Sequence, residues 1–260
     1  MAIFDSHTHL NDTPYAGKEA EFVAHAASLH VTNMAIVGSD TTMNANAIKL
    51  AQRFEALYAI VGWHPESAKD YTPDAEKVLL TQLALPEVVA LGEIGLDYHW
   101  DTSPQDVQRQ VFERQLAIAA SVNLPVSIHS REAFEDTYRL LAASKVSDFG
   151  GIMHSFTGDE TLAQRFLDLG MYISFSGMVT FKNAPLIQAA AKIVPDDKLL
   201  VETDAPYLTP VPYRGKPNEP GYTYYVVQKL AELRNTTPEH IAAVTYHNAQ
   251  EVFGLLNDKS

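Results

Sequence analysis

The chain contains 260 residues, 46% hydrophobic and 20% charged, and its 19 Lys and Arg against 32 Asp and Glu give a formal net charge of −13. This length and composition fit a globular α/β protein and exclude an intrinsically disordered chain. The absence of cysteine excludes disulfides and thiolate metal sites, and the acidic balance disfavours a broad phosphate-binding surface.

The first predicted strand begins almost at Met1, which leaves no room for a signal peptide ahead of it. No stretch approaches the ~18 consecutive apolar residues that a membrane span requires. We therefore expect a cytoplasmic protein that does not contact membranes.

Short apolar, β-branched runs alternate with amphipathic segments along the whole chain, a pattern typical of repeated βα units. Strands are predicted at residues 2–6, 33–38, 57–62, 88–92, 125–128, 151–153, 171–174 and 199–202. Helices are predicted at residues 18–30, 43–54, 73–84, 104–121, 131–143, 160–168, 185–193 and 222–234. These units predict one domain over residues 1–260, an α/β fold of the (β/α)8 TIM barrel class. A further helix at residues 238–246, with Thr237 as its N-cap, is expected to cover one barrel edge.

Residues that commonly bind metals follow most of these strands. In chain order they are His7 and His9 after the first strand, His64 after the third, Glu93 after the fourth, His129 after the fifth, His154 after the sixth and Asp204 after the eighth. Because the C-terminal ends of barrel strands converge on one mouth, we expect these side chains to meet there. Imidazole and carboxylate donors suit two divalent ions such as Zn²⁺, Mn²⁺ or Mg²⁺. The Pro- and Gly-rich loop at residues 206–221 is expected to lie over the same mouth.

An ordered series of motifs in the chain resembles the TatD family of metal-dependent deoxyribonucleases, within the amidohydrolase superfamily. The motifs are His7-Thr8-His9, Gly62-Trp63-His64-Pro65, Gly92-Glu93-Ile94-Gly95-Leu96-Asp97-Tyr98, His129-Ser130-Arg131, His154-Ser155-Phe156-Thr157-Gly158 and Glu202-Thr203-Asp204-Ala205-Pro206-Tyr207-Leu208. The resemblance spans essentially the whole chain. It implies one metal ion on His7, His9 and Asp204, a second on His129 and His154, and Glu93 as the bridge between them.

The family often carries a second tyrosine after the Gly-Leu-Asp-Tyr run, where this chain has His99. Substrate contacts near that loop are therefore expected to differ from the family's pattern, whereas the implied metal ligands show no departure.

A bridging carboxylate keeps two cations close, so that they can polarise a phosphoryl oxygen and activate a water molecule. We therefore assign catalytic roles to Glu93, as the bridge, and to Asp204, as the general base that accepts the proton of that water.

A phosphodiester substrate also needs cations near its non-bridging oxygens. The predicted mouth loops supply Arg131, Lys182, Arg214 and Lys216. Arg131 follows His129 by two residues and is the best candidate for a forked phosphate contact, although it can instead pair with Glu132 or Glu135.

Other polar and aromatic side chains near the predicted mouth are candidates for supporting roles. His64 can donate a hydrogen bond to a phosphate oxygen, and Tyr98 or Phe181 can stack on a base. Glu202 and Asp5 are expected in the second shell, where they orient a ligand or hold the barrel together.

These residues indicate a metal-dependent hydrolase that cleaves phosphodiester bonds, with single-stranded or frayed DNA ends as its substrate and no obligate protein partner. Two alternatives remain open from the sequence. The same ions would serve an ester or amide hydrolase, such as an aminoacyl-tRNA deacylase. A barrel that binds metal as a scaffold, without catalysis, is the third possibility.

Overall fold

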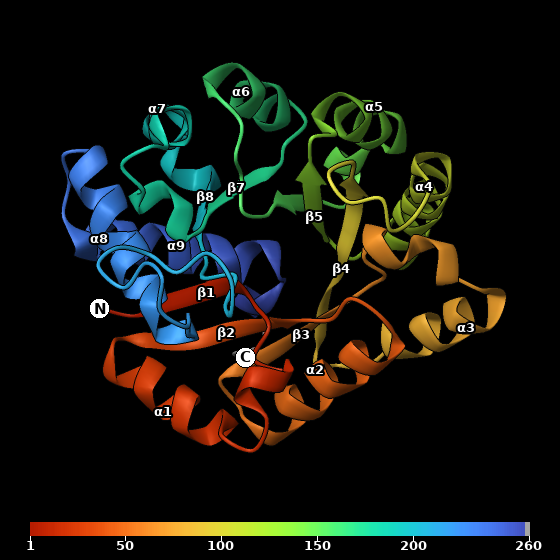
Figure 1. The fold of residues 1–260 in the computed structure, drawn as a ribbon, viewed down its shortest axis with the longest axis horizontal. Helices are drawn as coiled ribbons and strands as arrows, with labels where there is room; N and C mark the ends of the chain where they lie inside the picture. The colour runs from red at the N-terminus through yellow and green to blue at the C-terminus, as the bar shows by residue number, and fades with distance from the viewer. Residues whose placement is uncertain (258–260) are drawn as a thin grey trace.

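The computed structural model describes residues 1–257 and shows eight parallel strands arranged around a barrel in the order β1 to β8 (Figure 1). This arrangement confirms the predicted TIM-barrel fold. The strands are β1 (Ile3–Thr8), β2 (Val31–Val37), β3 (Leu57–Val61), β4 (Val88–Asp97), β5 (Val126–Arg131), β6 (Gly151–Met153), β7 (Tyr172–Phe175) and β8 (Leu199–Val201).

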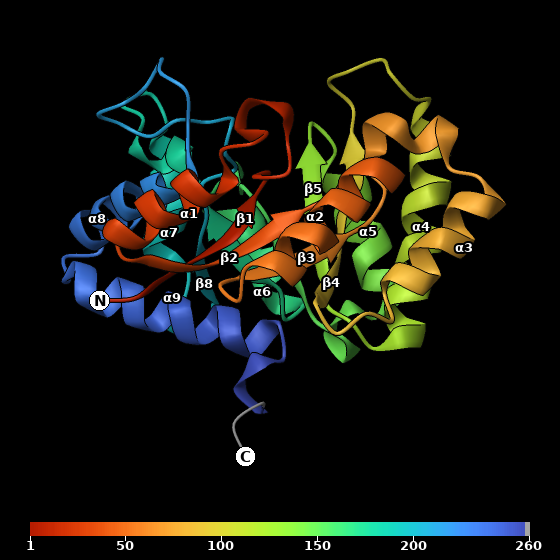
Figure 2. The ribbon, with the colours of Figure 1, turned by 90° about the horizontal axis from the view of Figure 1, so that it is seen from below.

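An α-helix follows each strand and packs outside the barrel, and a ninth α-helix follows the eighth (Figures 1 and 2). The helices are α1 (Glu19–Ser28), α2 (Thr41–Arg53), α3 (Pro73–Gln82), α4 (Gln105–Val122), α5 (Phe134–Ser144), α6 (Glu160–Asp168), α7 (Pro185–Ile193), α8 (Thr223–Leu233) and α9 (Pro238–Val252). Among residues 1–257, none of the helices has the length and apolar character needed to cross a lipid bilayer.

Side-chain caps explain several of the helix starts. Asp40 accepts the backbone N–H groups of Thr42 and Met43, each at 2.8 Å, at the start of α2. Thr237 accepts the N–H of His240 at 3.2 Å, which confirms the predicted N-cap of α9. The expected end of that helix was wrong, because α9 continues to Val252 and there packs against the barrel.

Strands β4 and β5 extend furthest beyond the residues predicted for them. β4 reaches Asp97 and β5 reaches Arg131, which lie side by side in the register of the two strands. The prediction that residue 131 begins a helix was therefore wrong, and α5 begins at Phe134. Propensity alone misses this extension, because cross-strand pairing outweighs the local preference of these polar residues.

Alternating strand residues fill the amino-terminal half of the barrel interior. Phe4, Ile60 and Leu200 belong to one buried cluster that also includes Ala249 of α9 and Phe253, the residue directly after that helix. Helix α9 therefore closes the amino-terminal end, as expected for the ninth helix, whereas the connecting loops gather at the other end (Figure 2).

The barrel closes between β1 and β8 without a regular strand ladder in residues 1–257. The N–H of Asp204 donates to the carbonyl of His7 at 3.0 Å, and the N–H of His9 donates to the carbonyl of Ala205 at 2.8 Å. The Ser6 hydroxyl donates to the carbonyl of Val201 at 3.0 Å. These bonds fix the His-x-His segment directly against the segment that carries Asp204.

Candidate functional site

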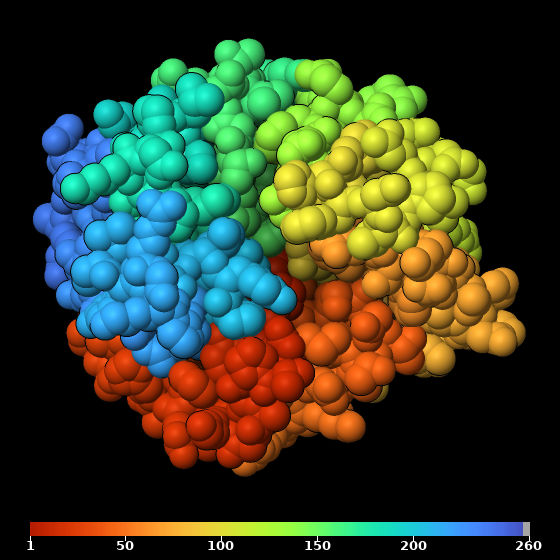
Figure 3. Space-filling view, viewed as in Figure 1, coloured from red at the N-terminus to blue at the C-terminus, as the bar shows by residue number. Residues whose placement is uncertain are grey.

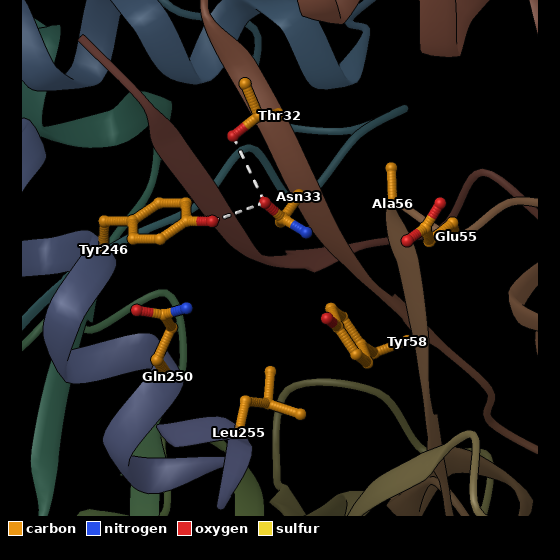
Figure 4. Close-up of a pocket in the computed structure, with 8 residues that line it drawn as sticks. All are labelled: Thr32, Asn33, Glu55, Ala56, Tyr58, Tyr246, Gln250 and Leu255. Carbon is orange, nitrogen blue, oxygen red and sulfur yellow. Dashed lines mark hydrogen bonds between the residues drawn. The ribbon is translucent and has the colours of Figure 1, made fainter. Parts of the chain in front are cut away.

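Two cavities lie at opposite ends of the barrel. The cavity at the amino-terminal end, about 520 Å³, is lined by residues of β2, β3 and α9 and by Leu255, with no histidine among them (Figure 4). The cavity at the carboxyl-terminal end measures about 970 Å³ and contains most of the predicted metal ligands. It opens in the hollow between the yellow segment after β4 and the light-blue segment after β8 (Figure 3). The candidate functional site is this second cavity.

The predicted ligands converge around Glu93. Its Oε2 lies 3.5 Å from Nε2 of His7 and 3.6 Å from Nε2 of His9. Its Oε1 lies 2.9 Å from both Nδ1 of His129 and Nε2 of His154. The carboxylate thus faces two separate histidine pairs, one with each oxygen.

Asp204 completes the pair that belongs to the first strand. Its Oδ1 lies 3.5 Å from Nε2 of His9 and 3.9 Å from Nε2 of His7. The backbone of Asp204 adopts a left-handed conformation with φ of +54°, which aspartate tolerates better than most residues. The chain therefore turns sharply after β8, where the N–H of Asp204 is bonded to β1.

Three of these side chains lie inside strands instead of following them, so that part of the prediction was wrong. His7 lies in β1, Glu93 in β4 and His129 in β5. Strand β4 approaches β5 so closely at Gly95 that a Cβ there would lie 1.9 Å from the carbonyl oxygen of His129. Only glycine fits at that point.

Hydrogen bonds on the far side of the His9 and His154 rings determine which nitrogen of each ring carries a proton. Nδ1 of His9 lies 3.1 Å from the carbonyl of Val37, which can only accept, so this nitrogen carries a proton and Nε2 presents its lone pair to the cavity. Nδ1 of His154 donates in the same way to Oε1 of Glu202 at 3.1 Å. Lone pairs directed at an acidic residue fit a cation between them.

The electrostatics of the site also favour positive charge at its centre. Burial alone would lower the pKa of His129, but hydrogen bonds with the carboxylates of Asp97 and Glu93 raise it to about 9. Burial would raise the pKa of Glu93, yet the imidazoles that face it, above all that of His154, hold it well below its ordinary value. The acids therefore stabilise cations on the facing nitrogens, whether protons or metal ions.

His64 differs from the other histidines in its tautomer. Its Nδ1 accepts the N–H of Glu66 at 3.2 Å, so the neutral ring carries its proton on Nε2, which faces Oε1 of Glu93 at 3.6 Å. A ring with N–H toward the cavity is a hydrogen-bond donor and not a metal ligand in this state.

Glu202 and Asp5, the two acids predicted to support the metal ligands, occupy different places. Glu202 accepts the N–H of Ser155 at 2.7 Å as well as Nδ1 of His154, and so holds that ring in place. Asp5 accepts the N–H and the hydroxyl of Thr203 at 3.0 and 2.5 Å, and thereby joins β1 to the segment after β8. Burial raises the pKa of the Asp5 carboxyl to about 8.

Asp97 is a residue of the site that we did not single out from the sequence. Its Oδ2 lies 2.8 Å from Nε2 of His129, and this contact leaves Nδ1 of the same ring facing Glu93. The sequence did contain a signal for Asp97, because residues 93, 95 and 97 of one strand point to the same face. It was missed because β4 was predicted to end at Gly92.

The predicted substrate-binding cations do not lie together. Arg131 lines the cavity, and its guanidinium carbon lies 5.5 Å from the centre of the Trp100 ring. Lys182 and Arg214 are exposed outside the cavity lining, and Arg214 lies over the ring of Phe181 at 4.1 Å. Tyr98 also lies outside the lining, with its hydroxyl donating to Asp136 at 2.6 Å.

Comparison with known proteins extends these observations over almost the whole chain. The family model described as TatD related DNase matches residues 4–254. The chain is 43% identical to the uncharacterized metal-dependent hydrolase YabD of Bacillus subtilis, over 97% of this chain and 99% of that protein. It is 34% identical to a protein of Citrobacter rodentium named 3'-5' ssDNA/RNA exonuclease TatD, over 97% and 98%. The crystal structure of the TatD homolog YjjV of Escherichia coli superposes with a TM-score of 0.92 at 30% identity, covering 97% of this chain and 98% of that one.

Proposed function

The chain belongs to the family of TatD-related DNases and is a metal-dependent hydrolase, and on that premise we propose that it cleaves phosphodiester bonds in single-stranded or frayed DNA ends. The observation that carries the proposal is a cation without an acidic partner beside the donor cluster, which we define as Glu93 and the side chains around it, His7, His9, His129, His154 and Asp204. Arg131 is exposed and lines the cavity, and no ion pair to it occurs within residues 1–257. Both neighbouring acids are engaged elsewhere, Glu132 with His99 at 2.7 Å and Glu135 with Arg165 at 2.5 Å. A free guanidinium at this place suits a phosphate group.

The donor set suits two divalent ions, in the division that the family resemblance implies. His7, His9 and Asp204 would hold one ion, and His129 and His154 would hold the other. Glu93 would bridge them, because its two oxygens face the two histidine pairs separately. Such ions, when bound, polarise a phosphoryl oxygen and lower the pKa of water. Zn²⁺, Mn²⁺ and Mg²⁺ are all compatible with nitrogen and oxygen donors.

Residues of the chain supply the remaining roles. Burial would raise the pKa of the Asp204 carboxyl, but the facing imidazoles of His9, His154 and His7 hold it below its ordinary value. Asp204 is therefore ionised at neutral pH and can accept the proton of the attacking water. The N–H on Nε2 of His64 can donate to a non-bridging phosphate oxygen, while Arg131 binds the same phosphate from the rim of the cavity.

The preference for single strands is supported by the relatives and by the shape of the site. Proteins of Citrobacter rodentium and Salmonella typhimurium that are 34% identical to this chain carry the name 3'-5' ssDNA/RNA exonuclease TatD. The donor cluster lies at the bottom of a hollow between loops (Figure 3). A strand end enters such a hollow more readily than the middle of a duplex.

The test is a digestion ladder of labelled oligonucleotides. Protein loaded with Mg²⁺, Mn²⁺ or Zn²⁺ is incubated with single-stranded DNA, blunt duplex DNA and an aminoacyl-tRNA ester. We expect stepwise shortening of the single strand and much slower cleavage of the blunt duplex. Hydrolysis of the aminoacyl ester without cleavage of DNA would overturn the proposal in favour of an ester hydrolase. Turnover of neither substrate by the metal-loaded protein would indicate a scaffold.

A further inference from the structure

Two large aromatic side chains are exposed at the mouth of the catalytic cavity. Trp100 is 50% exposed and Tyr207 is 56% exposed, and both line the cavity. The other tryptophan of the chain, Trp63, is only 8% exposed, and its indole N–H donates to the carbonyl of Ser67. Exposed rings beside a site for a charged polymer are surfaces on which nucleobases stack.

The two rings lie on opposite sides of the donor cluster. Trp100 follows β4 and Tyr207 follows β8, and in the strand order β1 to β8 these two strands face each other across the barrel. Figure 3 shows the corresponding yellow and light-blue segments on either side of the hollow. Tyr207 therefore lies on the side of His7 and His9, and Trp100 lies on the side of His129 and His154.

The backbone that carries Trp100 is fixed to the donor cluster. Oδ1 of Asp97 accepts the N–H groups of His99 and Trp100 at 2.9 and 3.1 Å, while Oδ2 of the same carboxylate contacts His129. The side chain of Gln108 accepts the N–H of Asp97 and donates to the carbonyls of Asp97 and Ser103. One carboxylate therefore sets both the orientation of the ring of His129 and the position of the indole.

The surroundings of each ring leave a face available to a ligand. The guanidinium of Arg131 lies over the indole at 5.5 Å, and the ring of His99 packs edge-on against it at 4.7 Å. The ring of Tyr207 packs edge-on against the ring of His9 at 6.1 Å. The backbone carbonyl of Tyr207 accepts a hydrogen bond from the side-chain amide of Asn218. Both rings are held by polar groups of the site, with about half of each side chain still facing solvent.

We propose that Trp100 and Tyr207 are two nucleobase platforms, one on each side of the scissile phosphate, and that the enzyme therefore requires unpaired bases on both sides of the bond it cleaves. This inference rests on the proposed phosphodiesterase function. Arg131, which lines the cavity beside the indole, binds the phosphate that joins the stacked nucleotide to the cleaved bond. The requirement for two unpaired bases explains a preference for single strands over duplex ends in terms of named side chains.

The test compares Trp100→Leu and Tyr207→Leu on single-stranded oligonucleotides that contain one abasic residue, placed either 5' or 3' of the cleaved phosphate. On the complete strand we expect each variant to raise KM by about tenfold. On the strand that lacks the base stacked by the altered ring, the variant and the wild type should have equal KM values. Trp100→Phe and Tyr207→Phe should restore most of the lost affinity, because they keep an aromatic face.

The matched control is Tyr138→Leu. The ring of Tyr138 also lies under an arginine, Arg165 at 4.2 Å, but it lies on α5 outside the cavity lining, so KM should not change. A loss in Trp100→Leu and Tyr207→Leu that is equal for complete and abasic strands would overturn the platforms while the phosphodiesterase function stands. A wild-type protein that cleaves no strand would instead overturn the proposed function.

Binding without chemistry gives a second readout. Addition of single-stranded DNA to the Asp204→Asn protein should quench the emission of the exposed tryptophan and protect it from iodide. Trp100→Phe in the same background should show neither effect, because Trp63 is buried. DNA binding that leaves iodide quenching of Trp100 unchanged would overturn its role as a platform.

Discussion

The two ends of the barrel are built from opposite kinds of side chain. At the carboxyl end, histidines and acids lie buried within 2.9 to 3.9 Å of one another around Glu93. At the amino end, the ring of Phe4 lies 5.6 to 6.0 Å from the rings of Phe253, Tyr58 and Tyr246. Buried charges oppose folding unless they are paired, whereas buried aromatic rings favour it. The aromatic cluster at the amino end therefore stabilises the fold, whereas the carboxyl end carries the residues proposed for chemistry. Substitutions at the amino end should lower the free energy of unfolding, and substitutions at the carboxyl end should lower activity.

The largest expected effect is a loss of activity at the carboxyl end. Asp204→Asn keeps the shape of the side chain and the backbone bond to β1, but it removes the carboxylate that accepts the proton. Hydrolysis of a labelled oligonucleotide should fall by about 10³-fold or more. The unfolding free energy of the metal-free protein, measured by urea denaturation, should change by less than about 1 kcal/mol. Activity within tenfold of the wild type would show that Asp204 is not the base.

At the amino end the expected effect is on stability. Phe253→Ala removes a nearly buried ring between α9 and the barrel, and the unfolding free energy should fall by about 3 to 5 kcal/mol. Activity per folded molecule should stay unchanged, because the strands separate this ring from the donor cluster. Phe253→Leu is the matched control and should lose less than about 1.5 kcal/mol. A comparable loss of activity in folded Phe253→Ala protein would contradict the division between the two ends.

A pH-dependent effect should appear at the carboxyl end. A proton on His129 competes with a metal ion, and because Asp97 and Glu93 raise the pKa of this ring to about 9, the affinity for Mn²⁺ should increase as pH rises from about 6.5 to 9. Asp97→Asn should bind Mn²⁺ about 10- to 100-fold more weakly at pH 9. The difference in Mn²⁺ affinity between the wild type and the variant should narrow toward pH 7. The reason is that His129 loses its proton more readily in the variant, which lacks the carboxylate of Asp97. Chelator competition measures both affinities, and a difference that widens as pH falls would show that Asp97 does not raise the pKa of His129.

The smallest expected effect lies in the cavity at the amino end. The hydroxyl of Tyr246 donates to Oδ1 of Asn33 at 2.7 Å (Figure 4). Tyr246→Phe removes this bond and should lower the unfolding free energy by about 0.5 to 1.5 kcal/mol with no change in hydrolysis. A change in oligonucleotide turnover without a change in thermal midpoint would indicate that this cavity communicates with the donor cluster.

The sequence was most informative where chemistry is encoded in short motifs. His7 and His9 are two positions apart, and Glu202 and Asp204 have the same spacing, so a strand or its continuation brings each pair to one side of the chain. Convergence of the strand ends then predicts that Glu93, His129 and His154 meet them. The structure does bring these residues together, although their role as metal ligands stays a prediction until a metal is measured.

The substrate contacts predicted from the sequence stay predictions, because hydrophobic periodicity does not constrain the positions of side chains in loops. Lys182 and Arg214 follow β7 and β8 as expected, yet they lie outside the cavity lining. Tyr98 and Phe181 were the residues predicted to stack on a base. The structure places two other aromatic side chains, Trp100 and Tyr207, in the cavity with exposed rings. Which side of a loop faces the mouth depends on contacts such as the bond between Asp97 and the N–H of Trp100.

Hydrophobic periodicity by itself determined the barrel class, and the order of the motifs determined the family. The periodicity depends on residues a few positions apart along one strand or helix, and the order of the motifs is read directly along the chain, so neither requires a distance in space. Only the tertiary structure decided which oxygen of Glu93 faces which histidine pair, which nitrogen of each imidazole points inward, and that Trp100 and Tyr207 both line the mouth. These features depend on distances between segments that are far apart in sequence, and such distances are set by strand pairing and barrel closure.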